Sequence, residues 1–206
     1  MSQIALPLDW PAGADERDYI VSEANRPLIR HFEHWSLWPV MATILTGPRK
    51  SGRSLLGRIF VNSSGGELID DAESADEEDI FHAWNRAQER RRPLILIADM
   101  PPPVWRVALP DLRSRLAATP AVRIEEPDDI LVAQLIERLC NMRGLAAPPE
   151  LVRYLVPRIE RSYLGVNRAV DALDALAFEH RQRLTVPLAR KALAAVGVID
   201  ESHIEG

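Results

Sequence analysis

Residues 47–54 read Gly-Pro-Arg-Lys-Ser-Gly-Arg-Ser, the G-x-x-x-x-G-K-[ST] phosphate loop with arginine in place of its lysine. The apolar run over 40–46 predicts a buried strand before the loop, and 55–60 predicts a helix after it. A turn between these elements presents backbone N–H groups and the positive end of a helix to phosphate. The pattern predicts a nucleotide-binding α/β domain; the alternative is a Gly/Ser/Pro turn that matches it by chance.

Each position that the phosphate-loop pattern specifies has its own expected role. Gly47 and Gly52 supply the backbone freedom of the turn, and the Ser54 hydroxyl can ligate Mg²⁺. Arg53 stands where the pattern has lysine. A planar guanidinium does not replace a compact ammonium at the terminal phosphates, so we expect weakened or altered catalysis with binding less affected.

The composition limits the class of protein. With 206 residues and 47% hydrophobic residues, the chain can form one domain plus a small second one. A net charge of −5 argues against a general surface for binding duplex DNA. The single cysteine, Cys140, cannot form an internal disulfide, which indicates a reducing compartment. Because no long apolar span or leader is present, we expect a soluble cytoplasmic protein without membrane contact.

Apolar periodicity divides the chain into two parts. Strands and helices alternate up to about residue 126, with helical spacing over 19–38, a strand over 40–46, a short apolar stretch at 67–71, a helix over 76–91 and a strand over 93–99. This alternation predicts a parallel sheet with helices on both faces.

From about residue 127 only helices are expected. They run over 128–142, from Pro148 or Pro149 to Ile159, over 164–181 and over 186–196. The predicted fold class is therefore α/β, a P-loop parallel-sheet domain followed by a small all-helical domain. The expected limits are a flexible tail at 1–17, the nucleotide-binding domain at 18–126, the helical domain at 127–199 and a tail at 200–206.

Acidic residues follow two of the predicted strands. Asp70 and Asp71 end an apolar stretch, where a nucleotide-binding sheet places its Mg²⁺-organising carboxylate; the alternative is the start of a solvated turn. Asp99 ends the strand over 94–98 and can face a phosphate or an attacking water, or can simply start a turn. The predicted cofactor is ADP or ATP with Mg²⁺, the metal held by Ser54 and Asp70.

A pair of arginines lies on the helix predicted to start near Leu109. Arg113 and Arg115 can present a guanidinium to phosphate, and such a group can act in trans on phosphoryl transfer. The alternative is an ordinary solvated helix face.

In these motifs the chain resembles the AAA+ ATPases of the DnaA group, and within it the Hda proteins that regulate the replication initiator DnaA. The resemblance runs through most of residues 3–197, and Hda proteins can themselves carry arginine at the position of Arg53. The similar segments are the Walker A loop at 47–54, Walker B at 68–71, the sensor 1 strand with its trailing prolines at 94–103, the arginine-finger box at 109–116 and the lid at 128–197.

The resemblance assigns Asp99 to the sensor position and the arginine finger to Arg115. Residues 55–67 are too few for the helix and extra strand that the family places before Walker B, so those elements are shortened or lost, or Walker B lies elsewhere. The family's sensor 2 arginine falls on Leu164, which leaves Arg161 and Arg168 as neighbouring nucleotide-sensing candidates.

The N-terminal hexapeptide Gln-Ile-Ala-Leu-Pro-Leu, residues 3–8, resembles the peptide by which Hda proteins dock into the bacterial sliding clamp, the β subunit of DNA polymerase III. Leu6 and Leu8 would enter an apolar pocket while Gln3 hydrogen-bonds at its rim. DnaA continues past its lid into a helix-turn-helix domain, whereas this chain ends at Gly206, so we expect no origin recognition.

The resemblance implies a negative regulator that is tethered to the clamp and stimulates ATP hydrolysis by DnaA through Arg115. Homo-oligomers are possible under this hypothesis. An autonomous P-loop ATPase of remodelling or loader type is an alternative. An inactive AAA+ adaptor that bridges the clamp to a partner is another.

Overall fold

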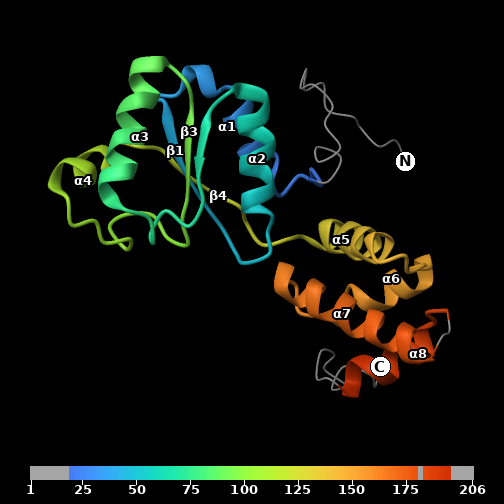
Figure 1. The fold of residues 1–206 in the computed structure, drawn as a ribbon. Helices are drawn as coiled ribbons and strands as arrows, with labels where there is room; N and C mark the ends of the chain where they lie inside the picture. The colour runs from blue at the N-terminus through green and yellow to red at the C-terminus, as the bar shows by residue number, and fades with distance from the viewer. Residues whose placement is uncertain (1–18, 181–182, 196–206) are drawn as a thin grey trace. The chain divides into compact units, whose positions relative to one another are not determined.

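The computed structural model describes residues 19–180 and 183–195 (Figure 1). These residues form two compact units. One comprises residues 19–47 and 52–124, and the other comprises residues 48–51 together with 125–180 and 183–195. The expected limits of the tails and domains stay predictions.

A parallel four-stranded sheet forms the centre of the first unit. The strands β1 (Ala42–Thr46), β2 (Glu67–Ile69), β3 (Leu94–Ile97) and β4 (Ala121–Arg123) have the spatial order β2-β3-β1-β4. Ile44 of β1 lies opposite Leu96 on one side and Ala121 on the other. Every residue of β1 and β3 is buried, as expected for central strands covered on both faces. The predicted fold class is confirmed.

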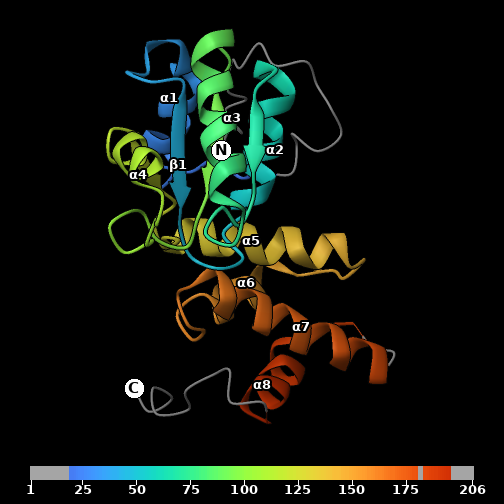
Figure 2. The same ribbon diagram turned by 60° about the vertical axis from the view of Figure 1, so that its left-hand side comes forward.

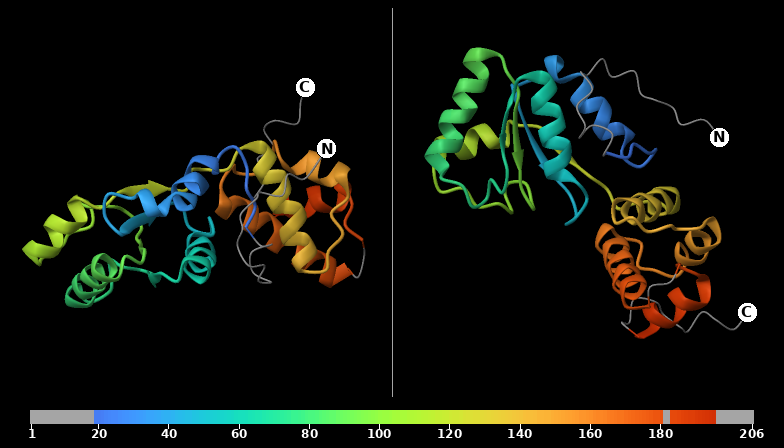
Figure 3. Two further views of the ribbon diagram at one scale, coloured as in Figure 1. Left: turned by 90° about the horizontal axis from the view of Figure 1, so that it is seen from above. Right: turned by 45° about the vertical axis from the view of Figure 1, so that its right-hand side comes forward.

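Four α-helices and one short 3₁₀ helix cover this sheet. The helix α1 (Arg26–Glu33), the 3₁₀ helix η2 (Trp35–Leu37) and α2 (Arg53–Ser64) lie toward one face, and α3 (Glu77–Arg90) and α4 (Pro110–Ala117) lie on the other (Figures 1 and 3). The rings of Phe32 and Phe60 join α1 to α2, with centroids 4.9 Å apart. Helices on both faces of a parallel sheet were predicted from the sequence, and this prediction is confirmed.

Two expected helices are shorter than their apolar spacing suggested. The helical period over 19–38 gives a helix only from Arg26, because Asn25 ties back the preceding segment: its Oδ1 accepts from Ser22 N, and its Nδ2 donates to the Ile20 carbonyl. The helix expected to reach Ile159 ends at Leu155. The strand β4 was not predicted, since its sequence Ala-Val-Arg has no apolar run.

The second unit is helical, as predicted. Its helices are α5 (Asp129–Met142), α6 (Pro149–Leu155), α7 (Tyr163–His180) and α8 (Val186–Ala195), shown from a second side in Figure 2. From the sequence either Asp128 or Asp129 can cap α5, and the structure shows Asp128 in this role, with its Oδ1 accepting from Leu131 N at 2.7 Å. The core packs apolar side chains of all four helices together, among them Val132, Leu151, Val170 and Leu193. Within the described ranges, no helix has the length and apolar character needed to cross a membrane.

Candidate functional site

The phosphate loop runs from the end of β1 to the start of α2. Gly47 has φ +151°, and a Cβ there would lie 2.8 Å from Ile124 Cβ, so only glycine fits without a shift. Gly52, with φ +86°, is the N-cap residue of α2 and provides no side-chain cap. The first amides of α2 therefore lack a side-chain partner at the cap, and this helix N-terminus is suited to receive an anion.

Ser51 adds a donor to this loop. The residue is buried, and its Oγ has no hydrogen-bond partner among the residues that the structure describes. A buried hydroxyl normally has a partner, and a phosphate oxygen would provide one. The loop glycines and this hydroxyl fit a nucleotide phosphate. The loop amides, Ser51 and Ser54 would hold ADP or ATP, and Mg²⁺ bound through Ser54 and Asp70 would neutralise phosphate charge.

Arg53 is fixed to the end of the neighbouring strand. Its Nη1 donates to the Ala98 carbonyl at 2.8 Å, and its Nη2 lies 2.8 Å from Asp99 Oδ1. The arginine side chain is 16% exposed and the Asp99 side chain is 56% exposed. The structure thus brings together two predicted site residues. Because each partly neutralises the other, the charge available to terminal phosphates is reduced, and so is the capacity of Asp99 to polarise water.

Asp70 and Asp71 follow β2 directly. Because β2 is parallel to β3, with Ile69 opposite Leu96, the acidic pair follows its strand as Asp99 follows β3. Both aspartates are exposed, and Asp71 has φ +53° with its amide donating to Asp70 Oδ1 at 3.1 Å. The helix α2 ends at Ser64 and β2 begins at Glu67, so only Gly65 and Gly66 separate them and no further strand lies between them.

Glu73 was not singled out from the sequence. Its carboxylate accepts from the amides of Asp99 at 3.2 Å and Met100 at 3.0 Å. The residue thereby fixes the segment that follows β3 to the segment that follows Asp71. A third acidic residue soon after β2 was the only sign in the sequence, and nothing there showed which loop it would contact.

Arg115 is half-buried on α4 against one face of α3. Its guanidinium carbon lies 4.1 Å from the ring centroid of Phe81 and 4.9 Å from that of Trp84, and its Nη1 donates to Asn85 Oδ1. Trp84 Nε1 in turn donates to Thr119 Oγ1 at 3.1 Å. The two aromatic faces and the amide hold the guanidinium in one place.

Arg113, the other candidate, is held differently. Its Nε and Nη2 donate to the Val107 carbonyl at 2.9 and 2.7 Å, and Nη2 also reaches the Ala108 carbonyl at 3.2 Å. These hydrogen bonds hold the Arg113 side chain against the backbone segment that leads into α4. Of the two arginines, Arg115 is held by aromatic side chains, whereas Arg113 hydrogen-bonds to backbone carbonyls of the segment before α4.

In the helical unit, both candidate sensing arginines pair with neighbouring carboxylates. Arg161 Nη1 lies 3.5 Å from Asp129 Oδ1, and Arg168 Nη1 lies 4.0 Å from Glu160 Oε2. Both arginines are exposed, so these pairs are weak and a nucleotide phosphate could compete for either cation. Leu164, at the position where the resemblance predicts the sensor 2 residue, is 36% exposed.

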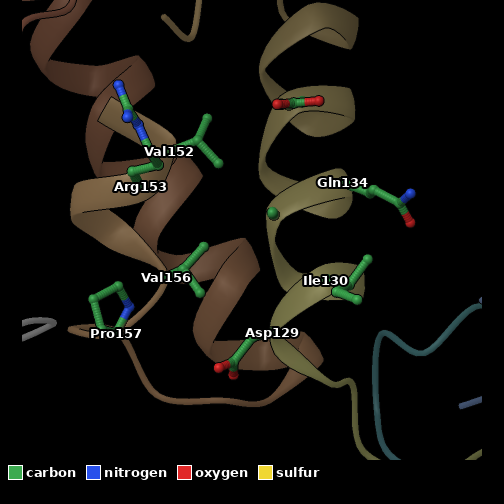
Figure 4. Close-up of a pocket in the computed structure, with 9 residues that line it drawn as sticks. Asp129, Ile130, Gln134, Val152, Arg153, Val156 and Pro157 are labelled. Atoms are coloured by element: carbon green, nitrogen blue, oxygen red, sulfur yellow. The ribbon is translucent and has the colours of Figure 1, made fainter. Parts of the chain in front are cut away.

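A groove of about 530 Å³ lies between α5 and α6 of the same unit. Figure 4 shows Val152, Val156 and Pro157 on one side and Ile130 on the other. Asp129 and Arg153 also line it. None of the predicted site residues lines this groove, although Asp129, the partner of Arg161, does. The lining is mainly apolar.

Comparison with known proteins bears on both units. Residues 129–193 match the family model described as the Hda lid domain. Domain III of the Thermotoga maritima replication initiation protein DnaA aligns with a TM-score of 0.70 and 14% identity, over 92% of this chain and 99% of that one. The helical unit is thus similar to the Hda lid domain, and the chain has the fold of DnaA domain III.

Other solved structures share this fold. AMPPCP-bound DnaA from Aquifex aeolicus has a TM-score of 0.60 at 16% identity, over 79% of this chain and 65% of that one. The RuvB Holliday junction branch migration motor of Thermotoga maritima has a TM-score of 0.64 at 13% identity, over 93% and 74%. At these identities the matches show the fold alone.

The lid expected at 128–197 contains the residues that match the Hda lid model. The predicted clamp-binding residues, Gln3, Leu6 and Leu8, lie outside the described residues. Among the described residues no group of three or more His, Cys, Asp or Glu side chains could hold a metal ion by itself. A P-loop Mg²⁺ needs only one or two protein ligands beside phosphate oxygens and water.

Proposed function

We propose that this protein is an Hda-like negative regulator of bacterial replication initiation, which binds the sliding clamp and promotes hydrolysis of the ATP bound to DnaA. The observation that carries the proposal is the holding of Arg115 on the surface of α3 by Phe81, Trp84 and Asn85. A guanidinium held in this way needs little reorganisation to reach the nucleotide of a partner.

The chain's own nucleotide site supports action on a partner over turnover of its own ATP. Arg53 replaces the lysine that would contact terminal phosphates, and its charge is shared with Asp99. A transferring phosphoryl group needs a cation free to follow its developing charge. Bound ADP or ATP would then serve the structure of the AAA+ unit, with little hydrolysis.

Residues 3–8 provide the tether in this proposal. A short peptide bound to a DNA-loaded clamp raises the local concentration of the regulator near DnaA, so that each separate contact can be weak. The protein would work in the cytoplasm and would need no DNA-binding surface of its own, in keeping with its net charge of −5.

The test is the rate of ATP hydrolysis by DnaA in the presence of DNA-loaded clamp and this protein. Arg115→Ala should lower the stimulated rate by on the order of 10³-fold, the low end for an arginine finger, and should retain clamp binding. Arg106→Ala, an exposed arginine just before α4, is the matched control and should stimulate like the wild type. Unchanged stimulation by Arg115→Ala would reject the assigned role.

An autonomous P-loop ATPase is the second candidate, supported by the glycine geometry of the loop and by the Ser51 hydroxyl, which has no partner among the described residues. It requires turnover by the purified protein that is lost in Asp70→Asn and Asp71→Asn. An adaptor without catalysis would bind both clamp and DnaA and leave the hydrolysis rate of DnaA unchanged.

A further inference from the structure

One face of α3 supports α4 along its length. Glu77, Phe81, Trp84 and Asn85 are spaced as i, i+4, i+7 and i+8, which places them on the same side of a helix. The last three contact Arg115 of α4. Glu77, a turn before them, is the one whose partners belong to the backbone entering α4.

The Glu77 carboxylate binds two successive amides at the start of α4. Its Oε1 accepts from Ala108 N at 2.7 Å, and its Oε2 accepts from Leu109 N at 2.6 Å. Leu109 is the N-cap residue of α4 and has no side chain that could cap the helix. Two hydrogen bonds to one carboxylate are charge-assisted and fix the direction in which the backbone enters the helix.

Glu77 is not required to cap its own helix. Asp76 does so, since its Oδ1 accepts from Glu78 N at 2.8 Å. From the other side, Arg113 of α4 binds the Val107 carbonyl. The entry of α4, residues 107–109, is therefore held at its amides by α3 and at its carbonyls by α4 itself.

We propose that Glu77 is a positioning residue for Arg115: by binding the amides of Ala108 and Leu109, it sets the place of α4 and hence of the guanidinium that acts on the partner. This inference rests on the function proposed above. The helix α4 has 8 residues, so a shift at its N-terminus moves its whole length, including Arg115. A displacement of about 1 Å is enough to cost a catalytic group up to about 100-fold in rate.

Glutamine at position 77 keeps the size of the side chain and removes the second good acceptor. An amide has one carbonyl oxygen, and its NH₂ group faces a backbone N–H unfavourably, so one of the two amides loses its partner. The matched control is Glu78→Gln, a change of the same chemistry at the adjacent, exposed residue.

Two measurements on the full-length protein test the proposal. The first is hydrogen–deuterium exchange of residues 107–117, which we expect to be faster in Glu77→Gln and unchanged in Glu78→Gln, with the melting temperature of the sheet unit retained. The second is DnaA hydrolysis over a range of regulator concentrations. Here Glu77→Gln should lower the rate at saturation by about 10-fold to 100-fold and leave the half-saturating concentration unchanged.

The outcomes separate this inference from the proposed function. Unchanged exchange at 107–117 in Glu77→Gln overturns the inference whether or not DnaA responds. Faster exchange with an unchanged saturating rate overturns it as well, because α4 would then have moved without consequence. Absence of stimulation by the wild type overturns the proposed function, while the exchange data still decide whether Glu77 holds α4.

Discussion

Arg53 and Asp99 form an ion pair, with Nη2 2.8 Å from Oδ1, that joins the phosphate loop to the end of β3. A second bond from the same guanidinium to the Ala98 carbonyl makes the contact bidentate. The planar fork of arginine allows both bonds at once, which an ammonium group on a single stem does not reproduce. Arg53, which replaces the lysine of the phosphate-loop pattern, therefore makes two contacts with the end of β3 that a lysine would not make together.

Arg53→Lys should break the contact between positions 53 and 99 and restore the lysine of the phosphate-loop pattern. We expect intrinsic ATP turnover to rise above the wild-type baseline, because the lysine can turn to the terminal phosphates and Asp99 is released. The free energy of unfolding should fall by about 1 kcal/mol for the lost hydrogen bond. Phosphate release and urea denaturation measure the two effects.

Arg58→Lys, at an exposed position of the same helix, serves as the control and should change neither quantity. A turnover that stays at the wild-type level in Arg53→Lys would show that some other feature of the site limits hydrolysis.

The second prediction concerns Gly47. An alanine Cβ would approach Ile124 Cβ at 2.8 Å and the Ile124 carbonyl oxygen at 3.1 Å, at a φ that L side chains rarely adopt. We expect Gly47→Ala to destabilise the sheet unit by about 3 kcal/mol, the sum of strain and overpacking. Tryptophan fluorescence during urea denaturation measures it, since Trp35, Trp38, Trp84 and Trp105 all lie in that unit.

Gly65→Ala separates strain from packing. Gly65 has φ +67°, and its nearest neighbour would be the flexible end of Arg92 at 3.2 Å. Backbone strain alone should cost about 1 kcal/mol there. Equal losses in the two variants would show that the close approach to Ile124 relaxes without cost.

The sequence predicted the elements whose signal is local. The all-apolar runs of β1 and β3 marked buried parallel strands, and Asp128 marked the start of α5. The elements that the sequence did not predict depend on contacts between distant parts of the chain. The strand β4 forms because it can pair with the free edge of β1, with Ile44 opposite Ala121. Its own sequence, Ala-Val-Arg, has no apolar pattern that would predict a strand.

The same reasoning applies to the candidate site. The phosphate loop, Asp99 and Arg115 could each be found from motifs, but their contacts depend on the sheet order. That order places β3 beside β1, so that Arg53 at the start of α2 reaches Asp99. Glu77 binds amides 31 and 32 positions away. No local pattern distinguishes it from the acidic residues around it.

The third prediction is a dependence of stability on pH from His31. Burial lowers the pKa of His31 below its usual 6.5. The ring stacks on Trp38 with centroids 4.7 Å apart, and its Nε2 lies 2.9 Å from Thr43 Oγ1. In the unfolded chain the imidazole binds a proton near pH 6.5, and in the folded protein it does so only at lower pH. The free energy of unfolding should therefore fall as the pH drops from about 7 through this window.

Urea denaturation at pH 7.5 and pH 5.5 measures this dependence. His31→Gln should flatten the change attributable to this residue, whereas His82→Gln, on the exposed side of α3, should keep the wild-type profile. An identical pH profile in wild type and His31→Gln would contradict the prediction.

The last prediction concerns the thiol of Cys140, which is fully buried in the core of the helical unit. Burial raises its pKa to about 11, with Arg143 lowering it and Asp174 raising it by smaller amounts. Only the thiolate reacts with iodoacetamide, so at pH 8 the folded protein should be labelled roughly a hundredfold more slowly than the urea-unfolded chain. Because Cys140 is the only cysteine of the chain, mass spectrometry reads the modification directly, and Cys140→Ser should abolish it. Equal rates in the folded and unfolded protein would show that the thiol is as accessible and as ionised in the helical unit as in the unfolded chain, contrary to its burial among Val132, Leu151 and Val170.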